Sequence, residues 1–205
     1  MNQQNTQSMK MKEYVRMITV LTLIAAVCGF LLATVKDLTA LRIEEQLLIN
    51  VKSPAVKSVL SGSDNDLIQD RQTIKVNNID YTVFVGKKQG KPWAIAYESK
   101  GAGFGGDIGI MVGYYLDKDS LTGIGILTHQ ETPGLGARIV ESSFRDQFKD
   151  LPLKTNFNVK KDNGKIDAVS GATNSSRGVC TAIRASIEQL DAVKKAVMKG
   201  IENHE

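Results

Sequence analysis

The stretch "DAVSGATNSSRGV", Asp167 to Val179, joins a turn to the longest regular pattern in the chain. Gly171 suits a tight turn, and Ser175 or Ser176 is expected to cap the helix that follows. From Val179 to Ile201, aliphatic side chains then recur at intervals of three and four residues. This spacing predicts a long amphipathic helix that buries one face and ends near Gly200.

The middle of the chain is rich in β-branched and aromatic residues. Four strand-like runs stand there, namely "DYTVFVGK", "PWAIAYESK", "IGIMVGYYL" and "LTGIGILTH". The segment "DKDSLTG" is typical of a hairpin connection between the last two, and a short helix is expected over "ARIVESSFRDQFKDL". Because the helices lie at the two ends and do not alternate with the strands, the predicted fold class is α+β, a mainly antiparallel sheet flanked by helices.

The N-terminal region has a different character. Residues 17–35 include no charged side chain, and such a run is about long enough to span a ~30 Å hydrocarbon core as a helix. Lys10, Lys12 and Arg16 precede it, which favours a cytoplasmic N-terminus. We therefore predict a cytoplasmic segment at 1–16 and a transmembrane helix at 17–35. The expected remainder is a helical linker and loop at 36–70, in which Pro54 interrupts the helix, and a single exported domain at 71–205.

Two other fates of the apolar run are less well supported. A cleaved signal peptide usually has a shorter apolar core and a small-x-small cleavage site, which this sequence lacks. Lipidation of Cys28 would require a small residue where Val27 stands. The sequence therefore favours a single-pass protein of the cell (inner) membrane, with its C-terminal domain on the extracytoplasmic or periplasmic side.

Composition argues against two classes of function. The net charge is only +4 and the lysines are scattered among acids, so we expect no nucleic-acid partner. Cys28 and Cys180 are far apart, and His129 and His204 are the only histidines. We therefore expect neither a disulfide framework nor a metal site.

Two glycine-containing segments are candidates for ligand contacts. "GAGFGG", Gly101 to Gly106, matches G-x-G-x-x-G, but a strand-like run follows it where a dinucleotide site needs a helix. A glycine-rich loop lying against something flat is the better interpretation. "THQETPGLGARI", Thr128 to Ile139, places Pro133, Gly134 and Gly136 just after a strand. It is either a plain loop or a turn whose backbone N–H groups face a ligand, with His129 at the rim rather than a catalyst.

The start of the last helix is the third candidate. A helix N-terminus carries free N–H groups and partial positive charge, so it suits a phosphate. Here it is surrounded by the hydroxyls of Ser170, Thr173, Ser175 and Ser176. A hydroxyl beside a bound phosphate could be esterified, although the spacing alone leaves open whether this happens.

Two motifs together resemble a known family. "DAVSGAT", Asp167 to Thr173, resembles the flavinylation motif of FMN-binding domains, whose closing threonine carries FMN through a phosphoester bond. "ETPGLG", Glu131 to Gly136, resembles the second signature of these domains, which occur in the G subunit of Rnf electron-transport complexes and in the C subunit of the sodium-pumping NADH:quinone reductase. The order of the motifs and the N-terminal anchor agree with this resemblance, which covers roughly residues 90 to 195.

The resemblance implies a role for individual residues. Thr173 would be the attachment residue, with Ser175 as an alternative because many relatives have threonine there, and Asp167 would be needed by the modifying flavin transferase. No catalytic residue and no metal ligand are implied. The remaining cofactor-binding residues would be Ser170, Gly171, Ala172, Ser175, Ser176, Glu131, Thr132, Gly134, Leu135 and Gly136.

The function implied by the resemblance is electron transfer. The chain would be a membrane-anchored component with covalent FMN, working with other membrane subunits of an Rnf-type ion-translocating oxidoreductase complex that couples ferredoxin/NAD electron flow to ion transport. The alternatives are a component like the C subunit of the sodium-pumping reductase, or another extracytoplasmic flavin carrier. An anchored binding domain without flavin is the alternative from outside the electron carriers.

Overall fold

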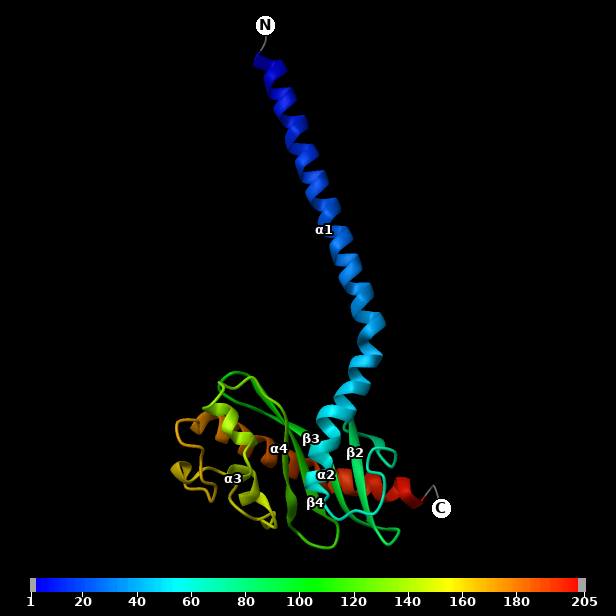
Figure 1. Cartoon of the computed structure of the whole chain (residues 1–205), viewed down its shortest axis with the longest axis vertical. Helices are drawn as coiled ribbons and strands as arrows, with labels where there is room; N and C mark the ends of the chain where they lie inside the picture. Colours follow the sequence, from blue (N-terminus) through cyan, green and yellow to red (C-terminus); the bar gives the residue numbers. More distant parts are fainter. Residues whose placement is uncertain (1–2, 203–205) are drawn as a thin grey trace. The chain divides into compact units, whose positions relative to one another are not determined.

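The computed structural model describes residues 3–202, which fall into two compact units that divide between Leu47 and Leu48. The first unit is one long helix, α1 (Gln3–Leu47), drawn in blue in Figure 1. Its stretch Lys12–Ala40 is long and apolar enough to cross a membrane, and the predicted span at 17–35 lies inside it. The large apolar side chains along this stretch are exposed, as expected of a surface that faces lipid.

The second unit begins with helical turns. A π-helical turn, η1 (Leu48–Lys52), leads into the short helix α2 (Ser53–Val59). The α-helix is interrupted just before Pro54, because α1 ends at Leu47 and the π-helical turn precedes α2, whose first turn contains Pro54. Proline is tolerated there, since the first N–H groups of a helix have no intrahelical partner.

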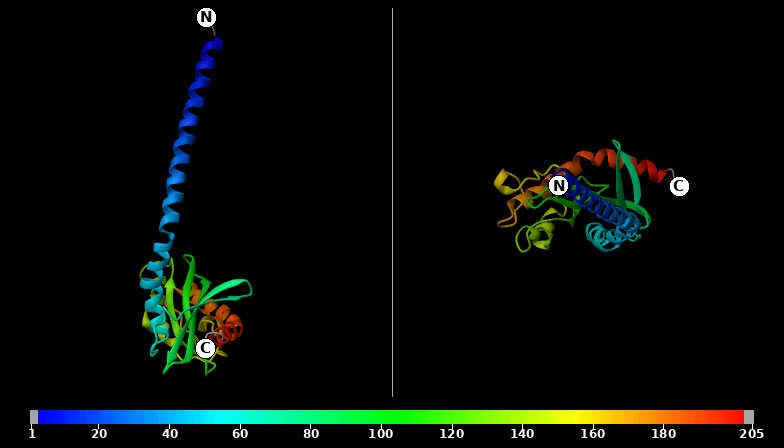
Figure 2. Two further views of the ribbon diagram at one scale, coloured as in Figure 1. Left: turned by 90° about the vertical axis from the view of Figure 1, so that its right-hand side faces the viewer. Right: turned by 90° about the horizontal axis from the view of Figure 1, so that it is seen from above.

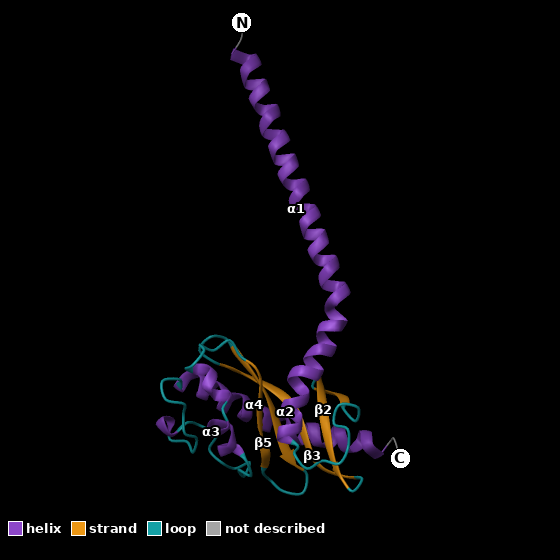
Figure 3. Cartoon of the chain, viewed as in Figure 1, coloured by secondary structure: helices purple, strands orange, loops and turns teal. Residues whose placement is uncertain are grey.

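Five strands form one antiparallel sheet in which every strand pairs with its sequence neighbour (Figure 3). The four expected strands and the hairpin between the last two are present, and the α+β class is confirmed. The first strand was not anticipated, because its five residues carry little signal of their own. It pairs through a tight turn at Asn77 and Asn78, both at positive φ, a turn chemistry that suits a hairpin. The strands are β1 (Gln72–Val76), β2 (Ile79–Lys88), β3 (Lys91–Ala102), β4 (Asp107–Tyr115) and β5 (Leu121–Thr128).

Helices cover both faces of the sheet (Figure 2, right). The C-terminal helix α4 (Thr173–Glu202) packs on the face that carries Tyr97 and Tyr114, and α2 packs on the face that carries Phe84 and Met111. The two buried tyrosine hydroxyls donate hydrogen bonds to Ser186 of α4, to its carbonyl and its hydroxyl respectively, each at 2.6 Å. The aromatic rings are thus buried without leaving their polar ends unpaired.

The ends of α4 correct two expectations. The helix begins at Thr173, so Ser175 and Ser176 lie inside its first turn, and neither is the capping residue. Ser176 instead reaches back, accepting a hydrogen bond from the Val169 N–H at 3.0 Å. Gly171 does form the turn, with φ of +79°. Gly200 does not end the helix, which continues at least to Glu202, the last residue that the structure describes.

The connection from β5 to α4 is irregular. The single helix expected over residues 137–151 is wrong, because Glu141 is extended and separates the turns. Buried Phe144 and Phe148 hold this segment against the sheet. Its elements are η2 (Gly136–Val140), α3 (Ser142–Arg145) and η3 (Asp146–Phe148), and a further turn, η4 (Lys160–Asp162), follows.

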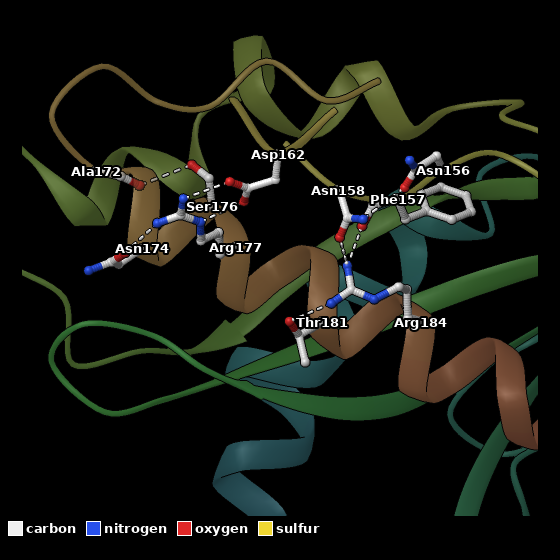
Figure 4. Close-up of polar contacts among 10 residues, drawn as sticks. All are labelled: Asn156, Phe157, Asn158, Asp162, Ala172, Asn174, Ser176, Arg177, Thr181 and Arg184. Carbon is white, nitrogen blue, oxygen red and sulfur yellow. Dashed lines mark hydrogen bonds and ion pairs between the residues drawn. The ribbon is translucent and has the colours of Figure 1, made fainter. Parts of the chain in front are cut away.

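Two arginines of α4 hold the segment around η4 (Figure 4). Arg184 donates to the Phe157 carbonyl at 2.6 Å and also to the Asn158 side chain. Arg177 makes a two-pronged ion pair with Asp162, at 2.7 and 2.8 Å. Residues 156–162 are therefore fixed beside the first turns of α4.

Candidate functional site

A pocket of about 350 Å³ lies where α4 begins. Four segments meet around it: the glycine-rich loop after β3, the turn after β5, η4, and the turn that leads into the first turn of α4. Its volume is within the usual range of small-molecule sites. The lining residues are Phe104, Glu131, Thr132, Leu135, Gly136, Lys161, Gly171, Ala172, Thr173, Asn174, Ser175 and Arg177.

Most of the predicted site residues meet at this pocket, although they come from separate parts of the sequence. Ser176 is buried next to the pocket, where its hydroxyl donates to the Ala172 carbonyl at 3.1 Å. Ser170, Gly134 and Asp167 are exposed and lie outside the lining. Lining residues among those predicted are Thr173, Gly171, Ala172, Ser175, Glu131, Thr132, Leu135 and Gly136.

Asp167 occupies a defined position outside the pocket. Its carboxylate pairs with Lys160 at 2.7 Å. Its backbone N–H donates to the side-chain oxygen of Gln147 at 2.8 Å, and its carbonyl accepts from the Gln147 amide at 3.1 Å. The exposed carboxylate is therefore presented on a backbone that is held in place.

The hydroxyls at the start of α4 differ in their accessibility. Ser175 is 1% exposed, and its hydroxyl donates to the Glu131 carboxylate at 2.6 Å. Ser176 is fully buried and its hydroxyl is hydrogen-bonded on both sides. Thr173 is only half-buried and lines the pocket. Of these three side chains, Thr173 is the least buried.

The same pocket wall is suited to an anion. The N–H groups of the first turn of a helix have no partner in the helix itself, and they carry partial positive charge. Lys161 and Arg177 also line the pocket, although the Arg177 charge is already compensated by Asp162. A phosphate at this wall would therefore meet backbone donors together with the lysine ammonium group.

Glu131, in the turn after β5, is hydrogen-bonded to both the glycine-rich loop and α4. Only 5% of the residue is exposed, and one carboxylate oxygen accepts hydrogen bonds from the backbone N–H groups of Phe104 at 2.8 Å and Gly105 at 3.1 Å. The other oxygen accepts the Ser175 hydroxyl. Burial alone would raise the pKa of Glu131, but these three hydrogen bonds outweigh it, so the pKa lies below its usual value of 4.5.

This depressed pKa predicts a pH-dependent contribution to stability. Ionised Glu131 stabilises the fold at pH values above its unfolded pKa, and the contribution disappears as the pH falls through the lower, folded pKa. Glu131→Gln is expected to lower the free energy of unfolding by about 1–3 kcal/mol at neutral pH, because the remaining hydrogen bonds no longer involve a charged acceptor. Denaturant titrations should show this difference shrinking as the pH is lowered through the pKa of Glu131 in the folded protein. A difference that stays constant with pH would contradict the prediction.

Several lining residues were not expected from the sequence. Phe104 is 74% exposed and belongs to the glycine-rich loop, for which contact with a flat group was the favoured interpretation. Arg177 lies one helical turn after Thr173, so its position on the same side of α4 could have been inferred from spacing. Lys161 comes from η4, and no local pattern connects it with the pocket.

Within residues 3–202, no group of three or more histidine, cysteine or acidic side chains is arranged to hold a metal ion. His129 accepts a hydrogen bond from the Glu131 N–H at 3.3 Å, and His204 lies outside the described residues.

Comparison with known families identifies an FMN-binding domain in the second unit, and the first unit is a single apolar helix. Residues 103–188 match the family described as FMN-binding domain, and this range contains every residue that lines the pocket. The chain belongs to the family of G subunits of ion-translocating oxidoreductase complexes, as the sequence resemblance predicted. Its cofactor is FMN, and it is a single-pass membrane protein.

Two relatives support this assignment over most of the chain. The G subunit of the ion-translocating oxidoreductase complex of Methanosarcina acetivorans is 30% identical over 188 residues, which are 88% of this chain and 96% of that protein. The G subunit of the proton-translocating ferredoxin:NAD(+) oxidoreductase complex of Clostridium ljungdahlii is 28% identical, covering 83% and 88%. Among solved structures, the C subunit of the Na(+)-translocating NADH-quinone reductase from Parabacteroides distasonis has a TM-score of 0.48 and 25% identity, covering 62% of this chain and 66% of that one.

Proposed function

We propose that Thr173 carries FMN through a phosphoester bond between its side-chain oxygen and the FMN phosphate. One observation carries this assignment: Thr173 is half-exposed in the pocket wall, whereas the hydroxyls of Ser175 and Ser176 are buried and already hydrogen-bonded. The motif that ends at Thr173 supports the same residue, and Ser170 lies outside the lining.

The attachment step needs an activated form of the cofactor and an enzyme. With a flavin dinucleotide as donor, the threonine oxygen forms a bond to the FMN phosphorus and the pyrophosphate bond breaks. The hydroxyl proton then leaves with the released nucleotide. A flavin transferase would catalyse this exchange and would recognise Asp167, whose backbone is already held by Gln147.

The residues of the pocket would then bind and orient the cofactor. The first-turn N–H groups of α4 and the Lys161 ammonium group suit the phosphate, and Thr132, Leu135 and Gly136 form the wall on the other side. FMN supplies the redox chemistry when it is bound. The protein needs no acid–base pair or nucleophile of its own, because its task is to place the ring.

We further propose that the chain is an electron-transfer component of a membrane complex that couples ferredoxin/NAD electron flow to ion transport. The names of its relatives support this role, and the other membrane subunits would be its partners. A covalent link suits such a carrier, because it removes dissociation and keeps the ring at a high effective concentration near its redox partners.

Mass spectrometry of one tryptic peptide tests the proposed attachment. The peptide from Ile166 to Arg177 contains Asp167, Thr173, Ser175 and Ser176. After co-expression with a flavin transferase it should carry the mass of one esterified FMN, and fragmentation should place this mass on Thr173. An unmodified peptide from protein matured in this way would refute the proposal.

The proposed side of the membrane can be tested by labelling in intact cells. Lys154→Cys places a thiol on an exposed residue of the C-terminal unit, whereas Lys12→Cys places one before the apolar span. A membrane-impermeant maleimide should label Lys154→Cys in cells whose cell wall or outer membrane has been made permeable while the cytoplasmic membrane stays intact. It should label Lys12→Cys only after the cytoplasmic membrane is broken. The reverse pattern would place the domain in the cytoplasm. The native thiols allow this test, because Cys180 is buried and Cys28 lies within the apolar span.

A further inference from the structure

The glycine-rich loop at 101–106 closes around the Glu131 carboxylate. Besides the two hydrogen bonds from the Phe104 and Gly105 N–H groups, the loop is closed on itself by the Gly103 N–H, which donates to the Gly106 carbonyl at 2.9 Å. A side chain at Gly103 would collide with the Glu131 carboxylate, and one at Gly105 would collide with the Gln130 carbonyl. The glycines are therefore needed for this contact, and not for a dinucleotide.

The loop carries an aromatic ring into the pocket wall. Phe104 is 74% exposed, although a ring of this size is normally buried in part. Leu135, from the turn after β5, is 45% exposed and lines the same pocket. Two exposed apolar side chains from separate segments thus lie at one cavity, whose remaining lining is largely polar or glycine.

We propose that Phe104 packs against the flavin ring, and that Glu131 is the positioning residue that holds Phe104 there through the backbone of the loop. This inference rests on the proposed function. A flat, largely apolar ring tethered at Thr173 would remove both Phe104 and Leu135 from water. Both oxygens of Glu131 accept hydrogen bonds from the protein, so this carboxylate is tied to the loop and to α4 before any cofactor binds.

Tryptophan substitution tests the position of Phe104. An indole in contact with a flavin quenches flavin fluorescence, because it donates an electron to the excited ring. In flavin-loaded protein, Phe104→Trp should therefore lower the fluorescence per bound flavin several-fold. Met198→Trp is the matched control, since Met198 is an exposed apolar residue near the far end of α4, and it should leave the fluorescence unchanged. The single native tryptophan, Trp93, is common to both variants.

The role of Glu131 is tested in the Phe104→Trp background. Adding Glu131→Ala should restore much of the fluorescence, because the loop loses its acceptor and the indole leaves the ring. Adding Glu131→Gln should keep most of the quenching, since the Gln side-chain carbonyl can still accept both N–H groups. In protein without flavin, amide hydrogen exchange at Phe104 and Gly105 should be slow, and Glu131→Ala should accelerate it.

The outcomes separate this inference from the proposed function. If the peptide from Ile166 to Arg177 carries FMN but Phe104→Trp fluoresces like Met198→Trp, the ring does not contact Phe104 and the inference is wrong. If quenching persists in the Glu131→Ala double variant, Glu131 does not position the loop. A peptide that carries no FMN overturns the proposed function instead. Amide hydrogen exchange in protein without flavin still tests the hydrogen bonds between Glu131 and the glycine-rich loop.

Discussion

Thr173→Val is expected to abolish covalent attachment of FMN completely. Valine has nearly the same shape as threonine and the same β-branching, so the start of α4 and the pocket should be preserved. The variant lacks only the oxygen that would form the phosphoester bond. Protein co-expressed with a flavin transferase should give a denatured gel band without flavin fluorescence, and the peptide from Ile166 to Arg177 should have its unmodified mass.

Ser175→Ala is the matched control for this loss. Ser175 is the other candidate acceptor, but its hydroxyl is buried and donates to Glu131, so its removal should leave flavin fluorescence in the gel. The variant should still be less stable by about 1–2 kcal/mol, because Glu131 loses a donor. If Ser175→Ala lost the flavin and Thr173→Val kept it, the attachment site would move to Ser175.

Hydrophobic spacing and composition correctly predicted the elements that bury a regular run of side chains. The spacing of aliphatic residues located α4, and β-branched runs located four strands, because each of these segments buries one continuous face or stretch. β1 was missed because it depends on pairing with β2 rather than on its own five residues. The helix expected at 137–151 was wrong because extended Glu141 interrupts a segment whose two buried phenylalanines have helical spacing.

For the site, too, local sequence patterns did not reveal contacts between residues that are far apart in the chain. The two motifs predicted that the turn at Glu131 and the helix start at Thr173 would serve one cofactor, and both line one pocket. The context of the glycine-rich loop argued against a dinucleotide site, but the sequence could not show that the loop contacts Glu131. The Phe104 N–H and the Glu131 carboxylate are 27 residues apart, and only the pairing of β3, β4 and β5 brings them together.

The packing of α4 against β3 depends on a close approach between two glycines. A side chain at Gly101 would collide with the Gly178 carbonyl, and one at Gly178 would meet the Ala102 carbonyl at 2.6 Å. This contact lies just beyond the first turn of α4, so it sets how closely the helix start, with Thr173, approaches the glycine-rich loop. The glycines therefore connect the stability of the fold with the dimensions of the pocket.

Gly178→Ala is expected to lower the free energy of unfolding by about 1–3 kcal/mol, because the added methyl group collides with backbone that cannot move independently. The prediction opposes helix propensity, which favours alanine over glycine inside a helix by about 1 kcal/mol. Equilibrium denaturation of protein without flavin measures the difference. In flavin-loaded protein, the displaced helix start should also alter the visible absorption of the ring.

Gly200→Ala separates packing from propensity within the same helix. Its added methyl group would lie 3.1 Å from the end of the Gln72 side chain, which can rotate away, so this variant should be as stable as the wild type or gain up to about 1 kcal/mol. Opposite signs for the two substitutions would mean that contact with the sheet, rather than glycine's cost in a helix, fixes Gly178. If both variants gained stability, α4 could move away from β3 without penalty, and the pocket at its N-terminus could not depend on that contact.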